Sequence, residues 1–447
     1  MKEENEIYAV GLEIANSKVC AIAGKKDAAG NIHILNYAES PYDPEYESMS
    51  KGSVLNSNNI TQTANRTLQE LANKASLEIG SVNANFSNTN ISLKSIKEAY
   101  TNDGNKFTVD EQILQKLVGN AKANFDKTKT PYLHVLPTDF YIDDMKIGKY
   151  PKGATGNKLT CQFNFVVTKK ESIDALHSAT DNLKYLFLDA KNSENEVSID
   201  QLIYSGVADA TSCLSVDDKQ NGILLINIGA QLTEICVYKD HGLRHTHVIG
   251  FGAQNIIKDL MHAFNITEQQ AFEVMSVCSD KPSKEIEINE VLELDGKNGL
   301  PKKQLLMKSL VMVIEYRLNE IISLASQNIL DSGYARVLGN GIIITGAVAR
   351  TGLVINLLEK TFHPLTVRVA NPTINIQKNP FFELSHPKYS TAIGLLLASL
   401  GPVDQRIPTA KTTKQKKRMP LFGFKNNPIS SIWERLEDPE LKRNYAE

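Results

Sequence analysis

Two short turns in the sequence have the residue types that could hold a phosphate group. Ala15–Ser17 separates the apolar segments IYAVGLEI and KVCAIAGK, and Gly229–Leu232 separates LLINI from TEICVY. Small residues in a tight turn leave backbone N–H groups open to an anion, provided that no Cβ blocks the approach. A third segment, TGAVAR at Thr345–Arg350, follows an apolar run and could hold a nucleoside. Together the three segments predict a nucleotide-type site.

The same turns also carry residues that disfavour tight phosphate binding. ATP-binding hairpins of this outline have an aspartate where this chain has Asn227, and glycine or threonine where it has Gln231 and Leu232. An uncharged amide is a poorer partner for hydrated Mg²⁺ than a carboxylate. Each lost charge-assisted hydrogen bond costs roughly 1.5–3 kcal/mol. We therefore expect the outline of a nucleotide site with weakened ATP binding and without fast ATP hydrolysis.

Other reactive residue types form weaker patterns. His245 and His247 alternate on one expected strand and His241 lies in a turn, without a neighbouring carboxylate or cysteine. A polar strand face is therefore favoured over a metal site. Ser205 lacks the G-x-S-x-G spacing of a nucleophile elbow. We expect no protein-bound metal centre and no catalytic residue.

The composition is that of an ordinary water-soluble chain. The 447 residues include 42% hydrophobic and 22% charged residues, with a formal net charge of −2. This length suggests about two to four compact units, and the balanced charge argues against nucleic acid as a partner. The acidic start lacks the features of a signal peptide, and no apolar run could span a bilayer. Five single cysteines are typical of reduced thiols in the cytosol.

The order of the expected elements predicts a duplicated α/β fold with a cleft between its halves. Each half opens with a three-strand meander, over residues 7–40 and 224–252. Between residues 84 and 166, short alternating segments rich in Asn, Lys and Thr indicate an inserted small domain. An irregular stretch is expected over 280–303. Helices are expected at 59–80, 170–183, 198–214, 253–264, 267–277, 304–329, 353–362 and 388–401.

Several motifs across nearly the whole chain resemble the bacterial cell-division protein family FtsA. They are VGLEI and SKV within 10–19, LHVLPTDFYID at 133–143, YPKGATGNKL at 150–159, LRHTHVI at 243–249, VRVANP at 367–372 and YSTAIGLLL at 389–397. The resemblance implies an actin-like (ribonuclease H-like) duplicated fold with two lobes around a cleft. It also implies a small α+β insert in the first lobe, which distinguishes this family from actin and MreB.

The resemblance further implies ATP with Mg²⁺ in the cleft. The family's Gly-Thr in the first turn is replaced by Ala15 and Asn16, and its AExxK helix reads AFEVM at Ala271–Met275. The positions that match the family's nucleotide site, several of them by substitution, are Glu13, Asn16, Ser17, Lys18, Asn227, Gly229, Ala230, Gln231, Thr345, Gly346 and Ala347.

By the same resemblance, the body should divide into four subdomains. The first combines residues 1–84, 167–198 and 385–400, and the insert covers 85–166. The core of the second lobe combines 199–254 with 338–384, and 255–337 would bind the C-terminal tail of the tubulin-like division protein FtsZ. Residues 401–427 would be a flexible basic linker and 428–438 an amphipathic helix.

A docking surface for the FtsZ tail is expected around Arg317, which matches a basic position of the family's surface. Lys302 and Lys303 are neighbouring candidates. Basic side chains beside an apolar groove can hold an acidic peptide that carries apolar side chains. The alternative for Arg317 is an ordinary ion pair on its own helix, with Glu320 as the partner.

The C-terminal tail combines a basic linker with an apolar stripe. Five of the eight residues over 411–418 are basic, and helical spacing begins after Pro428. The apolar residues are Leu421, Phe422, Phe424, Ile429, Ile432, Trp433 and Leu436. The acidic polar face favours a protein groove, whereas the basic linker favours anionic lipid. FtsA proteins attach to the inner membrane through such a helix, so the resemblance favours the membrane.

The resemblance as a whole implies a cell-division adaptor and not an enzyme. Such a protein would form actin-like filaments on the cytoplasmic face of the cell inner membrane, tether the FtsZ ring there and recruit later division proteins. Two alternatives stay open on the residues alone. One is an actin-fold ATPase or kinase that acts on a small molecule, and the other is a pilus-assembly adaptor of similar fold.

Overall fold

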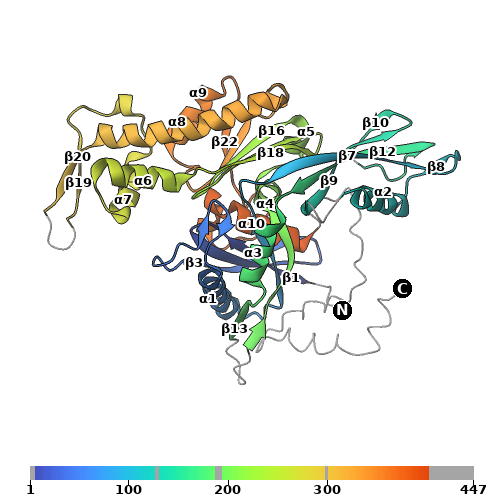
Figure 1. Cartoon of the computed structure of the whole chain (residues 1–447), viewed down its shortest axis with the longest axis horizontal. Helices are drawn as coiled ribbons and strands as arrows, with labels where there is room; N and C mark the ends of the chain where they lie inside the picture. The colour runs from blue at the N-terminus through green and yellow to red at the C-terminus, as the bar shows by residue number, and fades with distance from the viewer. Residues whose placement is uncertain (1–5, 126–129, 149, 187–193, 297–300, 402–447) are drawn as a thin grey trace.

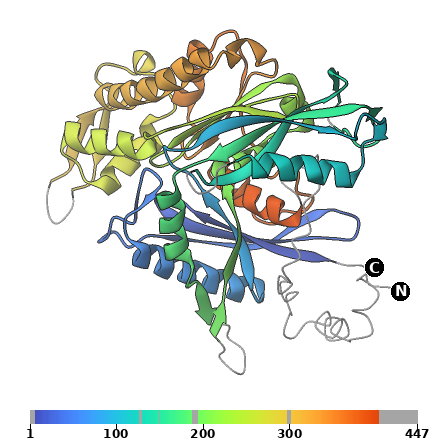
Figure 2. The same cartoon turned by 45° about the vertical axis from the view of Figure 1, so that its right-hand side comes forward.

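The computed structural model describes residues 6–125, 130–148, 150–186, 194–296 and 301–401. Two lobes lie one above the other in Figure 1, and the inserted small domain extends to the right beside the upper lobe. Each lobe is built on its own five-stranded sheet. The turned view in Figure 2 shows the same arrangement of two lobes and one insert.

The two sheets have the same topology. The first has the order β15 (Ser198–Tyr204), β6 (Ser81–Phe86), β1 (Ile7–Ile14), β2 (Lys18–Lys26) and β3 (Ile32–Pro41). The second has the order β18 (Gly242–Ile249), β17 (Thr233–Lys239), β16 (Ile223–Ile228), β21 (Ile342–Gly346) and β22 (Val367–Val369). Read from β22 to β18, it corresponds strand by strand to the first sheet read from β15 to β3. In each, an antiparallel meander is followed by two parallel strands. The predicted duplicated fold is therefore confirmed.

Two buried helices lie between the sheets, α4 (Ser205–Cys213) and α10 (Ser390–Leu400). They approach so closely that a Cβ added to Gly394 would lie 1.9 Å from the carbonyl oxygen of Ala208. Likewise, a Cβ on Gly11 of β1 would lie 2.6 Å from the backbone nitrogen of Leu396. These contacts bring the sheet of the first lobe directly against α10, since only glycine fits at both positions.

The remaining helices of the two lobes lie outside the layer between the two sheets. In the first lobe these are α1 (Ser57–Ala75) and α3 (Lys170–Thr180), and in the second lobe α5 (Val216–Asn221), α6 (Ala253–Phe264), α7 (Glu268–Cys278), α8 (Met307–Asp331) and α9 (Gly352–Thr361). Helix α8 buries one stripe against the lobe, including Leu310, Ile314, Leu318 and Ile321. This is the 3–4 residue period of an amphipathic helix. Among the described residues, none of the helices has both the length and the apolar character needed to cross a bilayer.

The insert has its own sheet and core. Its sheet has the order β10 (Met145–Ile147), β9 (Tyr132–Ile142), β12 (Lys158–Val167) and β7 (Ser92–Thr101), and α2 (Glu111–Ala123) packs on it. In that core the ring of Phe125 stacks on Phe165 with a centroid distance of 4.5 Å. The predicted α+β insert is therefore confirmed, whereas the exact subdomain boundaries stay a prediction.

The short elements complete the chain. They are β4 (Met49–Ser50), β5 (Ser53–Val54), β8 (Phe107–Thr108), β11 (Thr155–Gly156), β13 (Lys184–Leu186), β14 (Glu194–Glu196), β19 (Val291–Leu294), β20 (Lys303–Leu306) and the 3₁₀ turns η1 (Ser283–Glu285), η2 (Tyr334–Val337), η3 (Phe382–Ser385) and η4 (Pro387–Tyr389).

Some local expectations were wrong. The helix predicted over 198–214 is a strand up to Tyr204, because this segment pairs with β6 at the edge of the first sheet. The first sheet therefore continues beyond residue 198, where the second lobe was expected to begin. The helix predicted over 59–80 ends at Ala75, since Ser76 adopts a left-handed cap with φ 51°. The stretch 280–303 was expected to be irregular, but it contains β19 and the first residue of β20.

The substitution Gly394→Ala should destabilise the protein because the new methyl group would overlap the backbone of α4. We expect a loss of about 1–3 kcal/mol in the free energy of unfolding, measured by urea denaturation. Gly119→Ala is the matched control, since Gly119 lies in α2 with nothing within 4 Å of an added Cβ. The control should gain about 0.5–1 kcal/mol. Equal effects of both substitutions would contradict the close α4–α10 packing.

Candidate functional site

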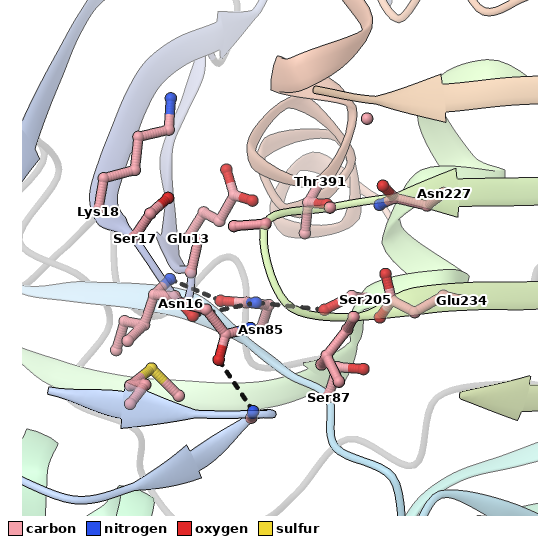
Figure 3. A pocket seen from close by; sticks show the side chains of 18 of the residues that line it. Glu13, Asn16, Ser17, Lys18, Asn85, Ser87, Ser205, Asn227, Glu234 and Thr391 are labelled. Atoms are coloured by element: carbon pink, nitrogen blue, oxygen red, sulfur yellow. Dashed lines mark hydrogen bonds between the residues drawn. The ribbon is translucent and has the colours of Figure 1, made fainter. Parts of the chain in front are cut away.

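A cavity of about 260 Å³ lies where the two predicted turns face each other between the lobes. The end of β1 contributes Glu13, and the first turn contributes Asn16, Ser17 and Lys18 (Figure 3). From the second lobe come Asn227, Gly229 and Ala230 with Gly346 and Ala347. The structure therefore brings together the predicted site residues, with the exception of Gln231 and Thr345.

The two exceptions have other partners. The hydroxyl of Thr345 is buried and donates to the carbonyl of Pro387 at 3.0 Å. The side chain of Gln231 points out of the cavity, where its amide group donates to Oε1 of Gln254 at 2.8 Å and its oxygen accepts from the backbone N–H of Lys51 at 2.8 Å. Neither side chain lines the cavity.

Both turns use part of their backbone donors internally. The N–H of Ala15 donates to the carbonyl of Lys18 at 2.9 Å, and that of Gly229 donates to the carbonyl of Leu232 at 2.9 Å. The first amides of α6, those of Ala253 and Gln254, donate to the second turn at 2.9 and 2.7 Å. These donors therefore stabilise the turns and the start of α6. A phosphate group would have to bind to the other amides.

The glycine of the third segment is required by the backbone. Gly346 has φ 97°, a left-handed conformation that favours glycine. A Cβ there would lie 2.3 Å from the carbonyl oxygen of Ile228 and 2.5 Å from Oδ1 of Asn227. Gly346 thus allows the end of β21 to lie against the end of β16, which brings the third segment into the cavity wall.

Buried carboxyl groups lie in and beside the cavity: Glu13 and Glu234 line it, and Asp209 bonds to two residues of its lining. Asp209 on α4 accepts from Nδ2 of Asn227 at 2.7 Å and from the hydroxyl of Thr391 at 2.8 Å. Within the described part of the chain, no partner lies within hydrogen-bond distance of Glu13 Oε2, Glu234 Oε1 or Asn227 Oδ1. Buried polar atoms without a partner are costly. These atoms therefore fit a ligand, ion or water that would supply donors.

Burial raises the pKa of these carboxyl groups. Desolvation raises the pKa of Glu13 from its ordinary value near 4.5 to about 7, while the charge of Lys18 partly opposes this. Desolvation also raises the pKa of Asp209 and of Glu234, and the charge of Asp209 adds to the shift at Glu234. Burial thus favours the protonated form of Glu13 and Glu234 at pH values where an exposed carboxyl group would be ionised.

The two lysines that line the cavity are paired outside it. Lys18 forms an ion pair with Glu39, and Nζ of Lys388 lies 3.5 Å from the same carboxylate. The side chain of Leu232 adds an apolar group to the lining. The cavity therefore has the shape and polar lining of a nucleotide site, but these lysines are not disposed to neutralise a polyphosphate.

Sequence reasoning missed several lining residues. Glu234, Thr391 and Lys388 were not predicted, and Ser205, considered only as a nucleophile, lines the cavity and accepts from Nδ2 of Asn85 at 3.2 Å. Asp209, which does not line the cavity but bonds to Asn227 and Thr391 of its wall, was not predicted either. One signal was available, because an acid in the small, apolar segment SGVADATSC must be buried with a specific partner.

The predicted docking residues are placed on the surface of the second lobe, each with a partner. The guanidinium of Arg317 on α8 donates to both carboxylate oxygens of Asp259 on α6, at 2.6 and 3.0 Å, and to Glu320. The predicted alternative, an ion pair with Glu320, is therefore present. Nζ of Lys302 lies 2.6 Å from Glu293, and Nζ of Lys303 donates to backbone carbonyls at the end of α6.

The remaining expectations concern the tail and metal ions. Leu421, Phe422, Phe424, Ile429, Ile432, Trp433 and Leu436 lie outside the described residues. Over the ranges that the structure covers, no three His, Cys, Asp or Glu side chains gather in a way that could hold a metal ion. A ring nitrogen of His245 instead lies 2.8 Å from Oδ1 of Asn328.

Two lobes of the same topology, joined by buried helices and separated by a cleft with facing turns, define an actin-like protein. The family model described as "Cell division protein FtsA" matches residues 224–394, and the "SHS2 domain inserted in FTSA" matches residues 90–167. Together they cover more than half of the chain. The chain therefore belongs to the FtsA family of cell division proteins.

Individual relatives agree with this assignment. The chain is 26% identical to the cell division protein FtsA of Escherichia coli K12 over 405 residues, which cover 89% of this chain and 91% of the relative. It is 25% identical to the FtsA of Pseudomonas aeruginosa over 397 residues, which cover 88% and 89%. A solved PilM-PilN type IV pilus biogenesis complex shares the fold, with a TM-score of 0.59 and 15% identity over 88% of this chain and 99% of that chain.

The substitution Glu13→Gln should change how stability depends on pH. The folded protein retains the Glu13 proton up to about pH 7, whereas the unfolded chain releases it near 4.5. Stability should therefore fall as pH rises through this window. Between about pH 5 and pH 8, wild type should lose roughly 1–3 kcal/mol in the free energy of unfolding relative to the variant, as measured by urea denaturation. Parallel curves for both proteins would contradict the uncharged state of Glu13.

Proposed function

We propose that this FtsA-family protein attaches the FtsZ ring to the cytoplasmic face of the cell inner membrane at the division site. The observation that carries the proposal is the presence of both family-specific parts, the FtsA body and the SHS2 insert, in one chain. The curated relatives are named as cell division proteins. The proposal includes actin-like self-assembly and recruitment of later division proteins.

The proposed role does not require rapid ATP turnover. The amides of the two turns that are not used internally would hold the phosphates, and bound Mg²⁺ would supply charge neutralisation. Asn227, Leu232 and the Lys18–Glu39 pair all weaken such a complex. ATP with Mg²⁺ is therefore proposed as a weakly held ligand, and the protein acts as an adaptor and not as an enzyme.

The FtsZ tail is proposed to bind to the subdomain of residues 255–337. Helix α8 places Tyr316, whose exposed fraction is 68%, next to Arg317, and Phe272 of α7 is also exposed. An acidic peptide with apolar side chains would use both kinds of contact. Because Asp259 already holds the guanidinium of Arg317, an acidic tail must share or replace that carboxylate.

Variants of the Arg317–Asp259 pair should change tail binding in opposite directions. Arg317→Ala should weaken the binding of a synthetic FtsZ C-terminal peptide by roughly tenfold, as measured by fluorescence anisotropy. Asp259→Asn should strengthen it by up to about fivefold, because the competing carboxylate loses its charge.

Two controls make this test specific. Arg336→Ala removes an exposed arginine on η2, beyond the C-terminal end of α8, and should leave the affinity unchanged. Asp259→Asn should have no effect in a chain that already carries Arg317→Ala. If Asp259→Asn strengthened binding there as well, Arg317 would not be the residue that contacts the peptide.

The membrane attachment is proposed to use the tail after residue 401. The helix spacing of Ile429, Ile432, Trp433 and Leu436 predicts one apolar stripe, and the upstream lysines favour anionic lipid. A single short helix gives reversible binding. Self-assembly would bring many tails to one membrane surface and raise the avidity without any new contact.

Flotation with anionic liposomes tests this attachment directly. The full chain should float, whereas a chain that ends at Ala410 and the full chain with Trp433→Glu should stay at the bottom of the gradient. Ser430→Ala, on the polar face of the same predicted helix, should float like wild type. If Trp433→Glu floated as well as wild type, the tail would bind a protein groove and not lipid.

A further inference from the structure

The hairpin of β4 and β5 reaches into the space between the two phosphate-type turns. Its tip consists of Lys51 and Gly52, which have φ 48° and 78°. Two successive left-handed residues form the tight turn that suits a two-residue hairpin loop. The backbone N–H groups of both residues donate to side chains outside the hairpin, and these side chains come from the two facing turns.

Each turn supplies one acceptor. The N–H of Gly52 donates to Oδ1 of Asn16 in the first turn at 2.9 Å, drawn as a dashed line in Figure 3. The N–H of Lys51 donates to Oε1 of Gln231 in the second turn at 2.8 Å. A further bond from Nε2 of Gln231 to Gln254 at the start of α6 orients the Gln231 amide. One hairpin tip thus joins the two turns across the cleft.

The tip also packs closely on both lobes. A Cβ on Gly52 would lie 2.0 Å from the carbonyl oxygen of Ser87, so the tip lies against the segment that follows β6. On the other side, Nζ of Lys51 lies 5.4 Å from the ring centroid of Phe251, a cation–π distance. A Cβ on Gly250 would lie 3.0 Å from Cδ of Lys51. The tip therefore fills the gap between the lobes at this position.

We infer that this hairpin tip, held by Asn16 and Gln231, keeps the cleft closed without any nucleotide. In each turn, one of the residues that depart from the phosphate-binding pattern, Asn16 or Gln231, accepts from the tip. A bound phosphate would join the two turns through their amides, and here two protein hydrogen bonds join them. ATP would therefore change the conformation of this protein little, even where it binds.

A second link between the lobes lies away from the tip. Arg244 on β18 forms an ion pair with Asp139 of the insert, with one N–O distance of 2.9 Å, and Nδ2 of Asn164 donates to the carbonyl of Leu243 at 2.8 Å. The hairpin tip contacts the second lobe separately from these residues. The test must therefore measure the opening there as well as the distance between the lobes.

The matched variants are Gln231→Ala and Gln254→Ala in the full chain. The first removes the hydrogen bond across the cleft, and the second removes only the bond within the second lobe. Hydrogen–deuterium exchange over residues 49–54 reports on the Lys51 amide. Cysteine substitutions of Gln62 on α1 and Glu359 on α9 accept spin labels selectively, because the five native cysteines are buried. Pulsed electron paramagnetic resonance then measures the distance between the lobes.

Without nucleotide, wild type and Gln254→Ala should show one narrow distance distribution that ATP with Mg²⁺ does not shift. Gln231→Ala should broaden it toward longer distances and speed the exchange of the Lys51 amide by about threefold to tenfold. The inference is overturned if nucleotide-free wild type is open and closes only with ATP and Mg²⁺. Wild-type behaviour of Gln231→Ala in both measurements would overturn it too. Neither result would affect liposome flotation or FtsZ peptide binding, so this test is independent of the proposed function.

Discussion

The close contact of α4 with α10 is the constraint on which the rest of the structure depends. These two helices fill the layer between the sheets, and their backbones meet where Gly394 faces Ala208. Asp209, one residue further on α4, accepts from Thr391 of α10 and from Asn227 at the end of β16. One buried carboxyl group thus connects both helices with the second sheet. The position of the cavity and of both turns follows from this connection.

The cavity shows how a shape can persist while its chemistry changes. Its walls come from strand ends and glycine approaches such as Gly346, which the fold itself requires. The charges are a separate matter, because burial suppresses the ionisation of Glu13 and Glu39 neutralises Lys18. The backbone has the outline of a nucleotide site, whereas the lysine side chains that could neutralise a polyphosphate form ion pairs with Glu39.

Ion pairs explain why surface basic residues are poor evidence for docking when they are read alone. Arg317, Lys302 and Lys303 all have partners within the second lobe. A partner protein must compete with those contacts, which lowers the net gain from each charge. Specific binding then depends on the arrangement of apolar groups such as Tyr316 around the charges. Membership of the FtsA family places the protein in cell division, whereas these local balances set how tightly it would bind its partners.

The sequence alone determined the features that depend on local pattern. Alternation and tight turns predicted both meanders, helical spacing predicted α6 to α10 in outline, and the change of texture near residue 84 indicated the insert. The resemblance of short motifs identified the family. These features can be predicted because they depend on the pattern of neighbouring residues, so the distant contacts of the fold need not be known.

Only the tertiary structure decided which distant residues meet. The segment 198–204 became a strand because β6 offers an edge, and Asp209 gained its role from Thr391, which lies 182 residues away. In the sequence, Gln231 only indicates that the second turn has lost a phosphate-binding residue. In the fold, its side-chain oxygen accepts a hydrogen bond from the amide of Lys51, 180 residues away. The physical reason is the same in each case. The sequence shows which hydrogen bonds a polar side chain or a strand edge could form, but which bond is made depends on the partner that folding buries beside it.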